Sequence, residues 1–165
     1  MTATYDCIAT TTLGSDQASV TFSSISGSYT DIILVTNEKQ SDARSSAIRF
    51  NSDTGSNYSQ TGLYGTGSTA GGFRTTSTNL IYYGYYAYST TSNFNFNSIV
   101  HIMNYSNTTT YKTVVSRANN ADNGVDEIVG LWRNTAAITS FVLTMQNLSN
   151  FKSGSTFTLY GIKAE

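Results

Sequence analysis

Apolar and polar residues alternate with a period of two along much of this chain, and this pattern restricts its fold more than any other feature. In residues 18–25, Val20 and Phe22 alternate with serines and a threonine. In residues 94–103, the phenylalanines and two aliphatic residues share one parity, whereas asparagines and the single histidine share the other. Successive side chains of a β-strand point to opposite faces, so the pattern predicts strands with one buried face.

About ten segments read as strands, at the spacing of roughly 8 to 12 residues that is typical of an all-β sandwich or barrel. Residues 32–35 are apolar on both faces, which places their strand in the middle of a sheet. No segment shows a helical period. The sequence predicts one all-β domain over residues 1–165, an antiparallel β-sandwich with jelly-roll topology as the expected arrangement. The predicted strands are 5–12, 18–25, 30–37, 47–51, 61–64, 94–103, 111–117, 127–133, 138–146 and 156–163.

The charge balance excludes several kinds of partner. Charged residues make up 12% of the chain, and nine basic and ten acidic residues give a net charge of −1. Binding to nucleic acid requires a basic surface that neutralises phosphates, so no nucleic-acid partner is expected. No apolar run is long enough for a membrane span and no secretory signal is visible, so the protein is expected to be soluble and made in the cytoplasm.

The stretch of about 65–92 is rich in glycine and tyrosine and has the least regular pattern, so we expect a long excursion from the sandwich. Within it, residues 82–88 read YYGYYAY, close in sequence to Arg74. Tyrosine offers a large contact area with a polar tip, and it is enriched at interfaces. Core filling, subunit contact and ligand recognition all remain open for this cluster. The expected contact residues are Tyr82, Tyr83, Tyr85, Tyr86, Tyr88 and Arg74.

No set of residues carries a convincing catalytic pattern. His101 is the only histidine, and Cys7, the only cysteine, lies in a terminal strand without a nucleophile motif around it. We expect His101 to be structural and Cys7 to be a core residue. Asp126 and Glu127 are adjacent, so in a strand they would point to opposite faces and could not flank one glycosidic bond. They are expected at a solvated loop end, and no enzyme activity is predicted.

No cofactor or metal is predicted either. The segment NNADNGVDE, residues 119–127, offers oxygen ligands of the kind that calcium prefers. It lacks the spacing of an EF-hand loop, and an Asx-rich hairpin loop explains it more simply. Calcium binding at this loop stays an open alternative.

Several stretches resemble a family of small structural proteins of tailed bacteriophages, cyanophages among them. The resemblance lies in STFTLYGIKAE (155–165), SIVHIMNYSNTTTYKTVVSR (98–117) and EIVGLWRNTAAITSFVL (127–143), and also in residues 8–35 and 48–59. Together these stretches cover most of the chain. The resemblance implies a jelly-roll or related β-sandwich in the virion, used as a capsid decoration (cement) subunit or as a tail-fibre module, commonly as a trimer.

Decoration of the head shell is the favoured role. The chain shows none of the coiled-coil, collagen-like or other repeats from which a fibre shaft is built. We therefore expect a homotrimer on the major capsid protein lattice, at the capsid surface of the virion. The alternative is a tail-fibre or receptor-binding module that recognises a host surface glycan.

Overall fold

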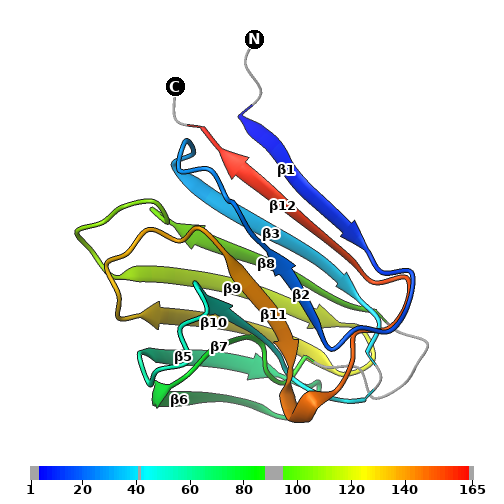
Figure 1. The fold of residues 1–165 in the computed structure, drawn as a ribbon. Coiled ribbons are helices and arrows are strands. Elements are labelled where there is room, and N and C mark those ends of the chain that lie inside the picture. Colours follow the sequence, from blue (N-terminus) through cyan, green and yellow to red (C-terminus); the bar gives the residue numbers. More distant parts are fainter. Residues whose placement is uncertain (1–3, 41, 88–94, 164–165) are drawn as a thin grey trace.

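The computed structural model describes residues 4–40, 42–87 and 95–163. Within these residues, twelve strands form two antiparallel sheets that pack against each other (Figure 1). The only helical element of this part is a 3-10 turn, η1 (Gln146–Leu148), and none of its helices is long and apolar enough to cross a membrane. The predicted antiparallel all-β sandwich is confirmed. The jelly-roll topology stays a prediction.

The larger sheet has eight strands and places the first and the last strand of the chain side by side (Figure 1). β1 is the edge strand and pairs with β12, so the last strand is tied into a sheet as expected. β3 lies between β12 and β8, in the interior position that its apolar run predicts. In spatial order the strands are β1 (Tyr5–Thr12), β12 (Thr156–Ile162), β3 (Asp31–Glu38), β8 (Phe96–Met103), β9 (Lys112–Asn120), β10 (Gly124–Trp132), β5 (Tyr58–Gly65) and β6 (Ala70–Thr78).

The smaller sheet has four strands and covers only part of the larger one. Its spatial order is β2 (Ser19–Phe22), β11 (Phe141–Met145), β4 (Ser46–Phe50) and β7 (Ile81–Gly84). We call the surface of the eight-stranded sheet that turns toward these strands the inner face, and the opposite surface the outer face.

One continuous core fills the space between the sheets. Trp132 of β10 is fully buried, and its ring centroid lies 5.5 Å from that of Phe50 and 6.2 Å from that of Tyr58. Its indole N–H donates to Asp53 Oδ2 at 2.7 Å, so the polar edge of the ring is satisfied. In the smaller sheet, the rings of Phe22 and Phe141 lie 5.1 Å apart. Burial of these large side chains from both sheets stabilises the sandwich.

Each of the ten predicted segments overlaps a strand, but the sequence pattern does not predict β6 and β7. β6 reads AGGFRTTST and offers one large apolar side chain, Phe73, while β7 is only four residues long. The excursion expected at about 65–92 is therefore wrong for residues 70–78 and 81–84. These residues form edge strands, one in each sheet.

Candidate functional site

The Tyr-rich segment divides between the core and one edge of the sandwich. Tyr83 of β7 is fully buried, whereas Tyr82, Tyr85 and Tyr86 are half-buried. Tyr88 lies outside the described residues. Of the four tyrosines that can be placed, three therefore reach the surface in part.

Tyr83 is a core residue because its hydroxyl is bound inside the sandwich. It donates to Oε1 of Glu38 at 2.7 Å, and Ser46 Oγ donates to Oε2 of the same carboxylate at 2.6 Å. Glu38 is fully buried, and desolvation raises its pKa above the ordinary value, although these hydrogen bonds act in the opposite direction. Tyr83 thus belongs to a buried polar cluster and not to a contact surface of this subunit.

The half-buried tyrosines pack with two rings from the neighbouring edge of the large sheet. The ring centroids of Tyr64 and Tyr86 are 3.8 Å apart in a stacked arrangement, and those of Phe73 and Tyr85 are 4.5 Å apart. Tyr82 lies 5.0 Å from Tyr85. We call these five residues the aromatic edge. They make a continuous aromatic surface where β5, β6 and β7 meet.

A buried carboxylate holds the aromatic edge in place. Oδ2 of Asp126 accepts the backbone N–H groups of Tyr85, Tyr86 and Ala87 at 2.7, 2.8 and 2.8 Å. Asp126 is 4% exposed, and desolvation raises its pKa while the three N–H groups lower it. Three hydrogen bonds to one carboxylate oxygen therefore tie the chain after β7 to β10.

The position of Asp126 differs from its expected place, a solvated loop end. It lies buried within β10, although its neighbour Glu127 is exposed as expected. The signal was present, since Asp126 shares its strand parity with Ile128 and Trp132, both of which are buried. Glu38 gives the same signal, because it shares the parity of Ile32 and Leu34.

Arg74 is separated from the tyrosines by the sheet itself. It pairs with Thr61 across β5 and β6, while the preceding residue, Phe73, pairs with Gly62. Adjacent strand residues face opposite sides, so Phe73 contacts the rings of the aromatic edge and Arg74 lies exposed on the outer face. The structure does not bring Arg74 together with the tyrosines.

The outer face carries more exposed aliphatic residues than a sheet surface in water usually does. Val35, Ile99, Val129, Val125 and Leu63 are 38%, 43%, 48%, 57% and 66% exposed. Antiparallel sheets with one wet face normally place polar residues on it. These five residues come from β3, β8, β10 and β5, so the apolar surface extends across most of the sheet.

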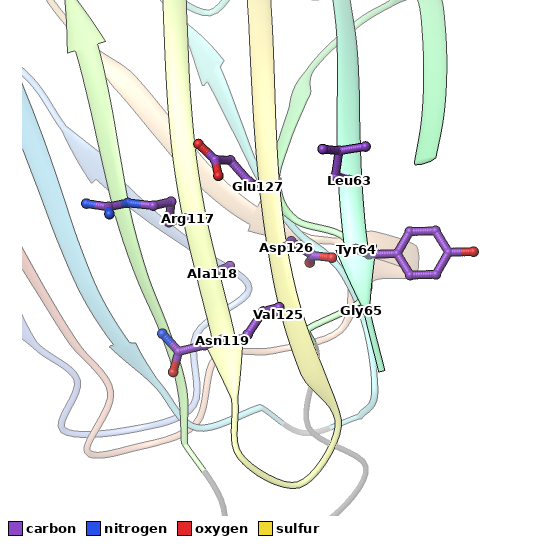
Figure 2. A pocket seen from close by; sticks show the side chains of 9 residues that line it. All are labelled: Leu63, Tyr64, Gly65, Arg117, Ala118, Asn119, Val125, Asp126 and Glu127. Carbon is purple, nitrogen blue, oxygen red and sulfur yellow. The ribbon is translucent and has the colours of Figure 1, made fainter. Parts of the chain in front are cut away.

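Shallow depressions mark this face. One of about 500 Å³ lies around Leu63, Arg117 and Glu127, which project from neighbouring strands (Figure 2). Another, of about 480 Å³, is lined by Tyr5, Ile99 and His101 as well as by Arg117 and Glu127. Charged and apolar side chains thus share the centre of the outer face.

The residues considered for catalysis lie apart from one another or have structural partners. Nε2 of His101 lies 2.8 Å from Oδ2 of Asp31, and Oδ1 of Asp31 accepts the backbone N–H of Asn104 at 2.7 Å. Cys7 is exposed on the edge strand β1, so the expectation that it is a core residue is wrong. The bulge between Cys7 and Ala9 shifts the parity of this strand relative to its partner.

The 119–127 segment is the hairpin that joins β9 to β10, as the Asx-rich composition predicts. Oδ1 of Asn120 accepts the backbone N–H of Asp122 at 2.8 Å, which is an Asx turn. Across residues 4–40, 42–87 and 95–163, no group of three or more His, Cys, Asp or Glu side chains is placed to hold a metal ion.

Comparisons with known proteins add no family to this picture. No family model matches the chain, and no curated protein matches it.

Proposed function

We propose that this chain is a non-enzymatic structural subunit of a tailed-bacteriophage virion that decorates and reinforces the head shell. The observation that carries the proposal is the aromatic edge. Tyr82, Tyr85 and Tyr86 are partly exposed and packed ring on ring, and Asp126 holds the backbone of Tyr85 and Tyr86. Aromatic residues are enriched in protein interfaces, and side chains that are already ordered lose less entropy on binding.

In this proposal the aromatic edge contacts a neighbouring subunit of a homotrimer or the major capsid protein lattice. The low charge of the chain, −1 in total, supports such a role. With little electrostatic steering, affinity comes from shape, apolar contact and the large number of copies on a shell. Binding to the shell is therefore expected to depend only weakly on salt concentration.

The test is binding to heads that lack the protein. The double variant Tyr85→Ala/Tyr86→Ala is mixed with such heads, and its occupancy is measured in density maps and by co-sedimentation. Interface aromatics commonly contribute more than about 1 kcal/mol each, so we expect occupancy to fall. Tyr111→Ala is the matched control, because Tyr111 is 55% exposed and lies outside the aromatic edge. Full occupancy of the double variant with an unchanged melting temperature would contradict the proposal.

A second candidate is recognition of a host surface glycan by a tail-fibre module. One observation favours it, the depression that combines the Tyr5 ring with His101, Arg117 and Glu127. An aromatic ring beside a few polar groups is a common form of small-ligand site. Specific labelling of the protein on tail fibres, together with loss of host adsorption in Tyr5→Ala, would favour this role over decoration.

A further inference from the structure

We infer that the outer face of the eight-stranded sheet is a contact between two copies of this chain, related by a twofold axis parallel to the strands between β9 and β10. This inference goes beyond the proposed function and uses a different surface. Its starting point is the set of exposed aliphatic residues on β3, β8, β10 and β5. Contiguous apolar surface of this kind marks interaction sites in soluble proteins.

The cross-strand register makes the row of outward-facing residues around Arg117 and Glu127 complementary to itself. Across the sheet, Ile99 is opposite Arg117, Arg117 is opposite Glu127, and Glu127 is opposite Leu63. A twofold axis between β9 and β10 therefore lays Arg117 over Glu127 of the partner subunit, and Ile99 over the partner's Leu63. Charge meets opposite charge and aliphatic meets aliphatic, as an isologous interface requires.

The next outward-facing residues on β9 and β10 also meet a residue of the same kind across the axis. Val115 is opposite Val129 in the register, so the axis places Val115 over the partner's Val129. Packed sheets cross at about 30°, which shifts positions far from the axis more than those near it. The residues named here all lie on the four strands nearest to the axis, β8, β9, β10 and β5.

Among the described residues, Arg117 and Glu127 form no ion pair, although they lie opposite each other on β9 and β10. The ion pairs among the described residues are His101 with Asp31, Lys152 with Asp16 and Lys163 with Asp6, and none includes Arg117 or Glu127. The guanidinium of Arg117 extends away from Glu127 (Figure 2). Both side chains are exposed. A second copy supplies each of them with an opposite charge, whereas a surface of one sign would repel its own copy.

The size of the overlap suits a stable dimer. Three strands lie on the short side of the axis, β10, β5 and β6, so the contact spans these and the three strands β9, β8 and β3. Six strands at about 4.8 Å spacing and about 27 Å length cover about 800 Å² per subunit. Standard protein interfaces bury about 800 Å² per partner. β1 and β12 extend beyond this area and remain free of the contact.

The dimer contact leaves the aromatic edge accessible, because those rings lie on the other side of the sheet. If the twofold axis meets the threefold axis of a trimer at a right angle, a contact through the outer face and one through the aromatic edge together close a hexamer of D3 symmetry. The measured mass therefore reports on each contact separately.

The test is a charge-swap experiment on the purified chain, with mass measured by sedimentation over a wide concentration series. Arg117→Glu and Glu127→Arg each place like charges across the axis, so each should weaken dimerisation at least about tenfold. The double variant Arg117→Glu/Glu127→Arg restores the opposite pairing and should restore the dimer. Arg44→Glu is the control, because Arg44 is exposed and lies outside the eight-stranded sheet. Circular dichroism of all variants checks that they fold.

A wild-type protein that stays monomeric at every concentration overturns the inference, and so does a trimer that ignores the charge reversals. Equal weakening by Arg44→Glu, or a double variant that fails to recover, also overturns it. The result is independent of the proposed function. A dimer that does not bind heads supports this contact and contradicts decoration, whereas a monomer that binds heads does the reverse.

Discussion

The two faces of the eight-stranded sheet depart in opposite ways from the usual arrangement, in which apolar side chains are buried and polar ones are exposed. The inner face buries charged and polar side chains, among them Glu38, Asp126 and Lys112. The outer face exposes aliphatic ones, such as Ile99 and Val129. Burying a charge is costly unless hydrogen bonds satisfy it, and exposing apolar area forgoes the hydrophobic effect. The inner face therefore serves the fold through a few specific hydrogen bonds, while the outer face retains apolar area that the fold of one chain does not use.

The largest expected change in the free energy of unfolding distinguishes Asp126 from its neighbour Glu127, which lies on the opposite face of the sheet. Asp126→Ala removes the acceptor of three backbone N–H groups, and leaving such groups unsatisfied should lower the free energy of unfolding by about 3 kcal/mol or more. Glu127→Ala, on the outer face, should change it by less than about 0.5 kcal/mol. Urea denaturation of both variants measures the two values. Equal effects would mean that Asp126 does not anchor the aromatic edge.

A second pair of variants places the same substitution, valine to threonine, once on the inner face and once on the outer face. Val100→Thr buries a hydroxyl at a fully buried inner position and should cost about 1–3 kcal/mol of folding free energy. Val129→Thr makes the same change at a position that is 48% exposed, and should cost less than about 0.5 kcal/mol in the monomer. Thermal unfolding at low protein concentration compares them. A costly Val129→Thr would show that the outer face already contributes to the stability of the single chain.

The buried carboxylate Glu38 should make stability depend on pH. Its folded-state pKa is raised by desolvation, so its favourable contribution is complete below the unfolded-state pKa and is lost as pH rises through the folded-state pKa. Asp126 acts with the same sign, whereas the lowered pKa of Asp53 acts with the opposite sign. The difference in the free energy of unfolding between wild type and Glu38→Gln isolates the contribution of Glu38. We expect the variant to gain stability relative to wild type as pH increases from about 4 to 8, near and above the ordinary glutamate pKa. A difference independent of pH would contradict a raised pKa.

The smallest effect concerns Cys7, at the part of the sheet that lies beyond the inferred dimer contact. An exposed thiol on an edge strand should react with a thiol reagent in the native protein, and Cys7→Ser should change stability by less than about 0.5 kcal/mol. The chain has no second cysteine, so reductant should leave its melting temperature unchanged within about 1 °C. Mass spectrometry measures the reaction of the thiol, and thermal unfolding measures the stability of the variant and the effect of reductant. A large drop under reductant would reveal a bridge between chains.

The contacts within the aromatic edge could not be predicted from the sequence. The run YYGYYAY indicates an unusual aromatic cluster, but not that Tyr83 points into the core while Tyr85 and Tyr86 stack on Tyr64 and Phe73. These partners come from β5 and β6, and β6 has too few apolar residues to be recognised as a strand. The parity of Asp126 within β10 was visible in the sequence. Its partners were not, because backbone N–H groups carry no sequence signal.

The all-β class and the position of most strands follow from the sequence, because alternation with a period of two is a local property of every strand. The sequence also marked β3 as apolar on both faces, which the structure shows as a buried side and a partly exposed one. The contacts between strands follow only from the three-dimensional fold. Cross-strand register brings Arg117 beside Glu127, and the folding of β7 against β10 brings Tyr85 to Asp126. Such pairings depend on contacts between residues far apart in the chain, whose energies no local pattern encodes.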